Sequence, residues 1–292
     1  MNEELLSSPP AVDDNATGQI ERREKLGYAQ SWRDFVAKQR PVIAAGAVKG
    51  WPALSKWEPE YLRSRAAGRM VNVGLSPTGV HDPYIKGSVK RMPFEEAVAQ
   101  VLSTGQTHHY YMMQVSIPAI LPELGQDIAV PYLIEHETVT ATNFWFGPGG
   151  NIAQLHYDKG HNLVAQVTGR KRVTLFDSRQ LYCLYPFPAL SPAPHVSRVN
   201  LQQPDLARFP SFRRARPFEG FLDPGDVLFI PVFWWHQFEG VDVNISVNFW
   251  WETPLMARLL SRQWARLTAS VVLKTIRHNV RRAVRTALPG KH

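Results

Sequence analysis

The spacing of apolar residues divides the 292-residue chain into three parts. In the first part, stretches with helical period alternate with short apolar runs. This pattern predicts helices over residues 31–38, 57–67 and 93–102 and strands over 41–45 and 70–75. Ser31 is the expected N-cap of the first helix, Gly68 ends the second, and Pro93 belongs to the first turn of the third.

From residue 110 onward, short β-rich runs follow one another, and Gly and Pro separate several of them. Such a succession is typical of a β-sandwich or jelly roll, so we predict a mainly β fold. Residues 185–217, rich in Pro and Arg, are predicted to form a long loop. The predicted strands are 110–116, 140–146, 154–157, 163–167, 172–176, 227–231 and 243–250.

After residue 253 the apolar residues again recur at three and four positions, which predicts an amphipathic helical tail. We therefore expect a flexible leader at 1–27, one domain at 28–252 and a tail at 253–292. The tail holds nine Lys or Arg and no acid, and subtracting nine from the net charge of +8 leaves −1 for the rest. The high isoelectric point of the chain therefore comes from the tail and gives little information about the domain.

Cysteine usage and hydropathy predict the compartment. Cys183 is the single cysteine, so no intrachain disulfide can form, which fits a reducing environment. The first residues lack the basic and apolar regions of a signal peptide, and no uncharged apolar run is long enough to cross a bilayer. These features predict a cytoplasmic protein.

Candidate chemistry begins with the triplet His156-Tyr157-Asp158. Residues two apart on a strand point to the same face, so His156 and Asp158 can offer an imidazole and a carboxylate to one metal ion. A polar pair without any metal is the alternative, because a His-x-Asp triplet arises by chance in many proteins.

A second histidine, His236, follows a turn, a buried apolar run and two tryptophans in residues 223–236. It could simply cap an aromatic cluster. Combined with His156 and Asp158 on a neighbouring strand, it completes the facial triad of two histidines and one carboxylate that is diagnostic for non-haem iron(II) oxygenases. The single cysteine argues against a thiolate zinc site.

Lys171 stands at the start of another apolar strand. A lysine inside a β-barrel is costly unless an anion pairs with it, and a dicarboxylate such as 2-oxoglutarate would do so. A lysine at the rim, exposed to solvent, is the alternative.

Together these residues resemble the Jumonji-C branch of the cupin superfamily, and in particular the asparaginyl hydroxylase of hypoxia-inducible factor and its bacterial relatives. The resemblance covers most of residues 30–252 and is carried by 150–176, 183–186, 208–210 and 224–250. It implies a double-stranded β-helix with flanking helices and a C-terminal helical region. It also implies Fe(II), 2-oxoglutarate as cosubstrate, and O2.

The resemblance assigns roles to individual residues. His156, Asp158 and His236 match the iron ligands, and Lys171 and Tyr111 match residues that hold the distal carboxylate of 2-oxoglutarate. Asn162, Asn248 and Trp250 match residues that line the same pocket.

The chain also departs from the family at several positions. Ala153 stands where the family often has Thr or Ser, which removes one hydrogen bond to the cosubstrate, a loss of roughly 1 kcal/mol. Met113 and His195-Val196 replace the polar residues with which the asparaginyl hydroxylase grips its peptide. A different substrate is therefore expected.

The expected reaction is hydroxylation of a protein or peptide side chain, with release of succinate and CO2. The alternatives are an RNA-base or small-metabolite hydroxylase of the same mechanism, and a metal-binding cupin without turnover. The tail is expected to form a homodimer interface. Its alternatives are packing on its own domain, or contact with RNA or an anionic membrane.

Overall fold

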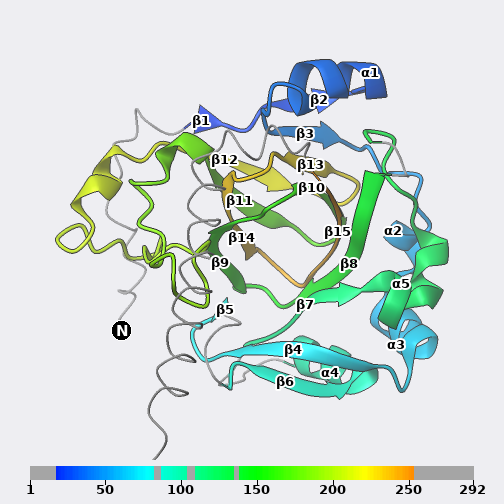
Figure 1. Cartoon of the computed structure of the whole chain (residues 1–292). Coiled ribbons are helices and arrows are strands. Elements are labelled where there is room, and N and C mark those ends of the chain that lie inside the picture. The colour runs from blue at the N-terminus through cyan, green and yellow to red at the C-terminus, as the bar shows by residue number, and fades with distance from the viewer. Residues whose placement is uncertain (1–17, 82–86, 104–108, 135–137, 253–292) are drawn as a thin grey trace, which may run out of the picture.

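Two β-sheets enclose a common interior in the computed structural model, which describes residues 18–81, 87–103, 109–134 and 138–252 (Figure 1). The smaller sheet has the strand order β1-β12-β11-β14-β9-β5 and the larger has β2-β3-β13-β10-β15-β8-β7-β4-β6. This arrangement confirms the predicted jelly roll. The smaller sheet consists of β1 (Gly18–Gln19), β5 (Val80–His81), β9 (Ile152–Tyr157), β11 (Lys171–Phe176), β12 (Pro217–Leu222) and β14 (Trp235–Gly240). The larger sheet consists of β2 (Arg22–Glu24), β3 (Val42–Ala45), β4 (Met70–Ser76), β6 (Val89–Pro93), β7 (His109–Ser116), β8 (Val139–Gly147), β10 (His161–Thr168), β13 (Val227–Ile230) and β15 (Asn244–Trp251).

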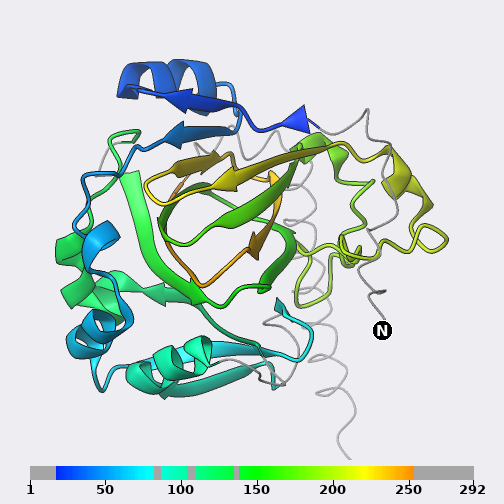
Figure 2. The same cartoon turned by 180° about the vertical axis from the view of Figure 1, so that it is seen from behind.

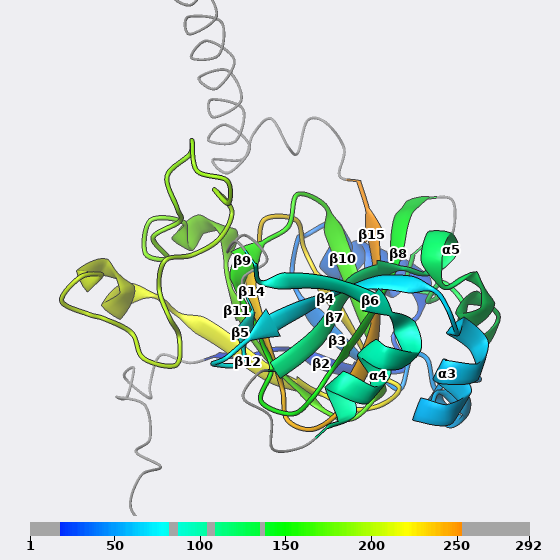
Figure 3. The same cartoon turned by 90° about the horizontal axis from the view of Figure 1, so that it is seen from below.

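Helices α2 (Ala53–Lys56), α3 (Pro59–Ala66) and α5 (Ile117–Ile120) cover the outer face of the larger sheet. Figure 2 shows these three on the opposite side of the molecule from the long irregular insert that joins β11 to β12. Helix α4 lies beside β4 and β6, as the view from below shows (Figure 3). Within the described ranges, no helix combines the length and apolar character that a membrane crossing requires. The helices are α1 (Tyr28–Ser31), the π-helix η2 (Trp32–Val36), α2 (Ala53–Lys56), α3 (Pro59–Ala66), α4 (Phe94–Leu102), α5 (Ile117–Ile120) and the 3-10 turns η3 (Pro122–Asp127), η5 (Ser178–Gln180) and η6 (Pro210–Arg214).

Strand β15 shows how the sequence positions the site. Its alternate residues Ile245, Val247 and Phe249 pack into the hydrophobic cluster under the helices. The intervening residues point to the opposite face because side chains alternate along a strand, and Ser246, Asn248 and Trp250 line the interior between the sheets. One strand therefore contributes three polar or aromatic side chains to a single cavity.

The insert between β11 and β12 has its own core. Leu184, Val199, Phe209 and Phe212 pack with Trp235 and neighbouring residues in a separate buried cluster. Ser197 anchors the insert, since its hydroxyl donates to the Leu184 carbonyl at 2.6 Å. The predicted loop at 185–217 is thus irregular but packed, with η6 as a short turn inside it.

Four sequence expectations need correction. The helix expected at 57–67 is α3, which begins later, at Pro59, because Trp57, at the C-cap of the preceding α2, has non-helical torsions. Ser31 is the last residue of α1 rather than an N-cap, and Pro93 is the N-cap of α4. The expected leader includes β1 and β2, which pair with β12 and β3, so residues 18–24 belong to the fold.

Candidate metal centre

Two adjacent strands bring the candidate metal ligands together. His156 on β9 lies directly opposite His236 on β14 in the antiparallel register, and Asp158 follows the last residue of β9. The Asp158 carboxylate oxygens lie 3.9 Å from His156 Nε2 and 3.7 Å from His236 Nε2. One ligand atom from each residue lies within 4.8 Å of the others. Asp158 lies just past the end of the strand, as the predicted bounds 154–157 imply, and its carbonyl accepts a hydrogen bond from the Phe233 amide.

Backbone carbonyls orient both imidazole rings. His156 Nδ1 lies 2.6 Å from the Gln154 carbonyl, and His236 Nδ1 lies 3.1 Å from the Trp234 carbonyl. Because a carbonyl only accepts, each Nδ1 carries the proton and each Nε2 turns its lone pair toward Asp158. Burial lowers the pKa of His236 to about 4, so the ring is neutral at pH 7. This is the arrangement that metal-binding histidines adopt.

A chain of side-chain hydrogen bonds holds the carboxylate. Trp145 Nε1 donates to Asn248 Oδ1 at 2.9 Å, and Asn248 Nδ2 donates to Asn162 Oδ1 at 3.3 Å. Asn162 Nδ2 then donates to Asp158 Oδ2 at 3.2 Å. Asn162 lies on β10 and Asn248 on the neighbouring β15, so the chain runs across the larger sheet to the triad.

Lys171 lies inside the fold, next to the triad. Its side chain is buried, and Nζ donates to Ser246 Oγ at 2.7 Å and approaches Tyr111 Oη at 3.5 Å. No carboxylate of the described residues forms an ion pair with it. Burial lowers the pKa of Lys171 to about 7. A small cavity of about 40 Å³ joins Lys171, Tyr111 and Ser246 to the three candidate ligands. An anion that reached this cavity would supply the missing charge.

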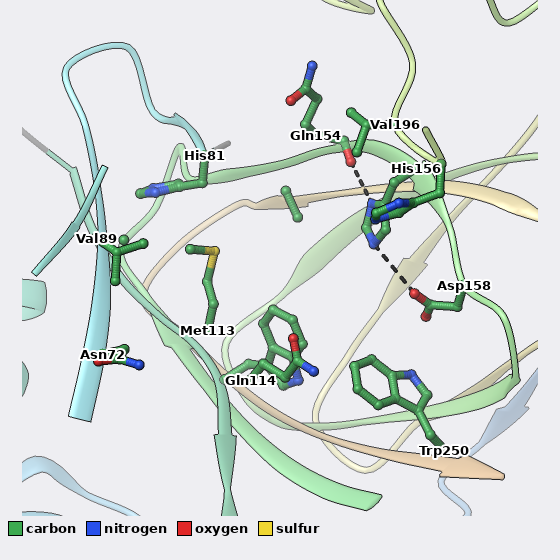
Figure 4. Close-up of a pocket in the computed structure, with 14 residues that line it drawn as sticks. Asn72, His81, Val89, Met113, Gln114, Gln154, His156, Asp158, Val196 and Trp250 are labelled. Atoms are coloured by element: carbon green, nitrogen blue, oxygen red, sulfur yellow. Dashed lines mark hydrogen bonds and ion pairs between the residues drawn. The ribbon is translucent and has the colours of Figure 1, made fainter. Parts of the chain in front are cut away.

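A larger pocket of about 340 Å³ borders the triad, and Figure 4 shows the residues that line it. Its wall combines two tryptophans, Trp145 and Trp250, with amide and imidazole side chains. His156 and Asp158 form part of this wall, so a molecule bound in the pocket would contact the metal centre. The remaining wall residues are Asn72, Gly74, His81, Val89, Met113, Gln114, Ala153, Gln154, His195 and Val196.

Comparison with known proteins identifies the family. The model of the cupin-like domain family matches residues 28–256. This chain belongs to the cupin-like family, in its Jumonji-type branch.

Its relatives carry different names. Lysine-specific demethylase 8 of Xenopus tropicalis is 35% identical over 227 residues, which cover 76% of this chain and 50% of the relative. The tRNA wybutosine-synthesizing protein 5 of Homo sapiens is 29% identical over 250 residues, which cover 80% of this chain and 78% of the relative. The human bifunctional peptidase and (3S)-lysyl hydroxylase JMJD7 is 30% identical over 255 residues, which cover 76% of this chain and 80% of the relative. The chain spans about half the length of the first of these.

The residues of this Jumonji-type centre fit Fe(II) and 2-oxoglutarate. Two histidines and one carboxylate bring their ligand atoms within 4.8 Å of one another, and they form the donor set of a facial triad. The buried Lys171, with no acidic partner among the described residues, fits the distal carboxylate of the cosubstrate. Ala153 lines both cavities, and its methyl group offers no hydrogen bond where the family often has a hydroxyl.

The structure gathers all eight expected site residues. His156, Asp158, His236, Lys171, Tyr111, Asn162, Asn248 and Trp250 all line the small cavity. Met113 and His195-Val196 line the larger pocket. Sequence reasoning missed Ser246, Trp145, His81, Gln114 and Gln154. Ser246 could have been found, because it lies two residues before Asn248 on the same face of β15.

Proposed function

We propose that this chain is an Fe(II)- and 2-oxoglutarate-dependent oxygenase that hydroxylates a protein or peptide side chain and releases succinate and CO2. The observation that carries the proposal is Lys171, a buried lysine without an acidic partner among the described residues, in the cavity that the triad lines. A cupin that only held a metal would have no need of a dicarboxylate subsite.

Each group has a task in this reaction. His156, Asp158 and His236 would hold iron, which with 2-oxoglutarate and O2 supplies the oxidising power. Lys171 and Tyr111 orient the cosubstrate by its far carboxylate. Asn162 keeps the Asp158 carboxylate in place through its 3.2 Å hydrogen bond. Trp145 and Trp250 line both cavities and would contact a substrate bound beside the metal centre.

The test is succinate formation by the full-length protein with Fe(II), ascorbate and 2-oxoglutarate, together with mass spectrometry of treated host-lysate proteins for the gain of one oxygen atom. Asp158→Ala should lose metal and turnover by more than about 100-fold, because loss of an outer-shell partner alone costs about 10- to 100-fold. Asp34→Ala, which removes an exposed carboxylate beside Arg33, is the matched control and should keep both. Full activity in Asp158→Ala would refute the triad assignment.

Hydroxylation of an RNA base is the second candidate. Two tryptophans line the larger pocket, and flat aromatic walls suit base stacking. One relative is named as a tRNA wybutosine-synthesizing protein. Treated RNA from the same lysate, analysed as nucleosides for an added oxygen, separates this candidate from protein hydroxylation.

A further inference from the structure

Most of the surface of the larger pocket is apolar, and the described residues that line it carry little charge. Among these described residues, Asp158, a candidate metal ligand, supplies the only carboxylate, and none is a lysine or an arginine. The polar groups are instead amides and imidazoles, from Asn72, Gln114, Gln154, His81 and His195. An ammonium or guanidinium group that entered this pocket would lose water without gaining a free counter-charge.

A β-bulge shapes one wall of the pocket. The register of β7 against β8 shifts between Met112 and Val115, and Gln114 has the left-handed torsion φ +54. Neighbouring residues of a regular strand point to opposite faces, yet Met113 and Gln114 both line the pocket. The bulge therefore adds Gln114, an exposed polar side chain, to the wall of the pocket. Left-handed backbone in a residue other than glycine is strained, and such strain often marks functional sites.

His81, which also lines the pocket, is a buried histidine with no hydrogen bond to the residues that the structure describes. It is 2% exposed, and neither ring nitrogen has a partner among the described residues. Burial, and to a smaller extent His109, lowers the pKa of His81 to about 4, so its ring is neutral, with one donor and one acceptor. Native proteins rarely leave such groups unpaired, so each one calls for an explanation.

Met113 connects His81 to the rest of the pocket. A Cβ atom on Gly74 would lie 2.3 Å from Met113 Cε and 3.1 Å from His81 Nδ1, so the absence of a side chain at Gly74 makes room for both. Figure 4 shows the thioether end of Met113 reaching toward His81. A methionine chain is flexible and can turn aside at little cost, which would open His81 to a ligand.

We propose that His81, Met113 and Gln114 form a substrate subsite that accepts an uncharged side chain able both to donate and to accept hydrogen bonds, as a carboxamide or an imidazole does. The proposal rests on the proposed function, since it names the substrate class of the same site. A neutral imidazole and an amide each offer a donor and an acceptor, so together they complement such a group. A lysine side chain has three donors, no acceptor and a charge for which the described wall residues offer no carboxylate apart from Asp158, a candidate metal ligand.

Peptide pools with one fixed central residue and random flanks test the substrate class. Full-length protein with Fe(II) and 2-oxoglutarate is given pools centred on Gln, Asn, His, Lys or Leu, and succinate formation above the peptide-free rate is measured. At least one of the Gln, Asn and His pools should exceed both the Lys and Leu pools by about tenfold. Preference for the Lys or the Leu pool would overturn the proposal. The amount of each pool that binds to immobilised Mn(II)-loaded protein gives the same comparison without turnover.

Two variants test the residues. His81→Leu removes the unpaired nitrogens, so the melting temperature should stay unchanged or rise while the preference between pools is lost. A lower melting temperature with the preference intact would make His81 a structural residue and overturn its role. Gln114→Ala should weaken the preference, whereas Gln39→Ala is a matched control, because Gln39 also has a left-handed torsion, φ +51, but lies outside this pocket. If the wild-type protein forms no succinate with any peptide pool, the result counts against the proposed function. The binding of the pools to Mn(II)-loaded protein then still tests the subsite.

Discussion

At the scale of single residues, Lys171 links cosubstrate binding to pH. Its pKa of about 7 in the unliganded protein comes from burial, and a dicarboxylate beside it would restore the charged form. At pH 8 most Lys171 side chains are neutral before binding and charged after it, so 2-oxoglutarate binding should take up close to one proton. At pH 6 the lysine is already charged, and the uptake should vanish. Affinity should therefore fall as pH rises above about 7.

Calorimetry of 2-oxoglutarate binding in two buffers with different ionisation enthalpies measures this uptake. Lys171→Met should abolish it and weaken binding by roughly 1.5 to 3 kcal/mol, the usual value of a hydrogen bond to a charged group, with little change in iron affinity. Lys90→Met, on the exposed edge strand β6, should change neither. An unchanged KM for 2-oxoglutarate in Lys171→Met would place the cosubstrate elsewhere.

Residue-level prediction from sequence worked where spacing reflects geometry. His156 and Asp158 are two apart, and strand alternation leads from Asn248 to Trp250 on the same face of β15. It failed for Gln114, because the bulge in β7 breaks the alternation that the inference uses. It also missed His81, whose strand β5 has only two residues and no periodic pattern to recognise.

At the scale of elements, the neighbouring strands β10 and β15 position the candidate metal ligand Asp158 through Asn162 and Asn248. Replacing Asn162 with Leu removes the donor to Asp158 and leaves Asn248 Nδ2 without its acceptor. We expect metal affinity to fall about 10- to 100-fold, as for other outer-shell partners of metal ligands. Stability should also fall by about 1 to 3 kcal/mol, because Asn248 is buried.

Titration with Mn(II), alongside thermal unfolding, measures both effects. Asn200→Leu, outside both cavities, is the control and should keep the metal affinity. Asn248→Leu should be less damaging to metal binding than Asn162→Leu, because Asn162 still donates to Asp158, and the double variant should lose less than the sum of the two. A variant that is only less stable, with metal affinity intact, would contradict the positioning role.

Element prediction succeeded for long β-rich runs and failed where aromatic or proline-rich segments form strands. The predicted strand at 163–167 corresponds to β10, which is buried on both faces. Strand β14 was missed because its sequence has two polar residues and a histidine among aromatics, and it takes its partners from β11 and β9. Strand β12 was missed because it begins at Pro217, next to the Pro- and Arg-rich insert, and it is held by tertiary pairing.

At the scale of the whole molecule, charge is divided between the domain and the tail. Residues 1–252 carry a net charge near −1, whereas residues 253–292 carry nine basic residues and no acid. The tail lies outside the described residues, so its expected helix and its role in a homodimer remain predictions from sequence. A helix through Met256, Leu260, Trp264, Leu267 and Val271 would have an apolar stripe, with Arg258, Arg262 and Arg266 on the opposite side.

The two faces of that helix allow the dimer to be tested in the full chain. If the apolar stripe forms the interface, Trp264→Asp and Leu267→Asp together should turn a dimer into a monomer in sedimentation velocity at micromolar concentration, because two buried carboxylates would lack partners. Arg262→Gln, on the opposite face, should leave the dimer intact. Wild-type chain that sediments as a monomer would exclude this role. In that case the arginine face is tested for binding to RNA or to anionic vesicles. Binding that weakens with added salt and with Arg262→Gln would show that the tail binds a polyanion, because neutralising phosphates releases counterions.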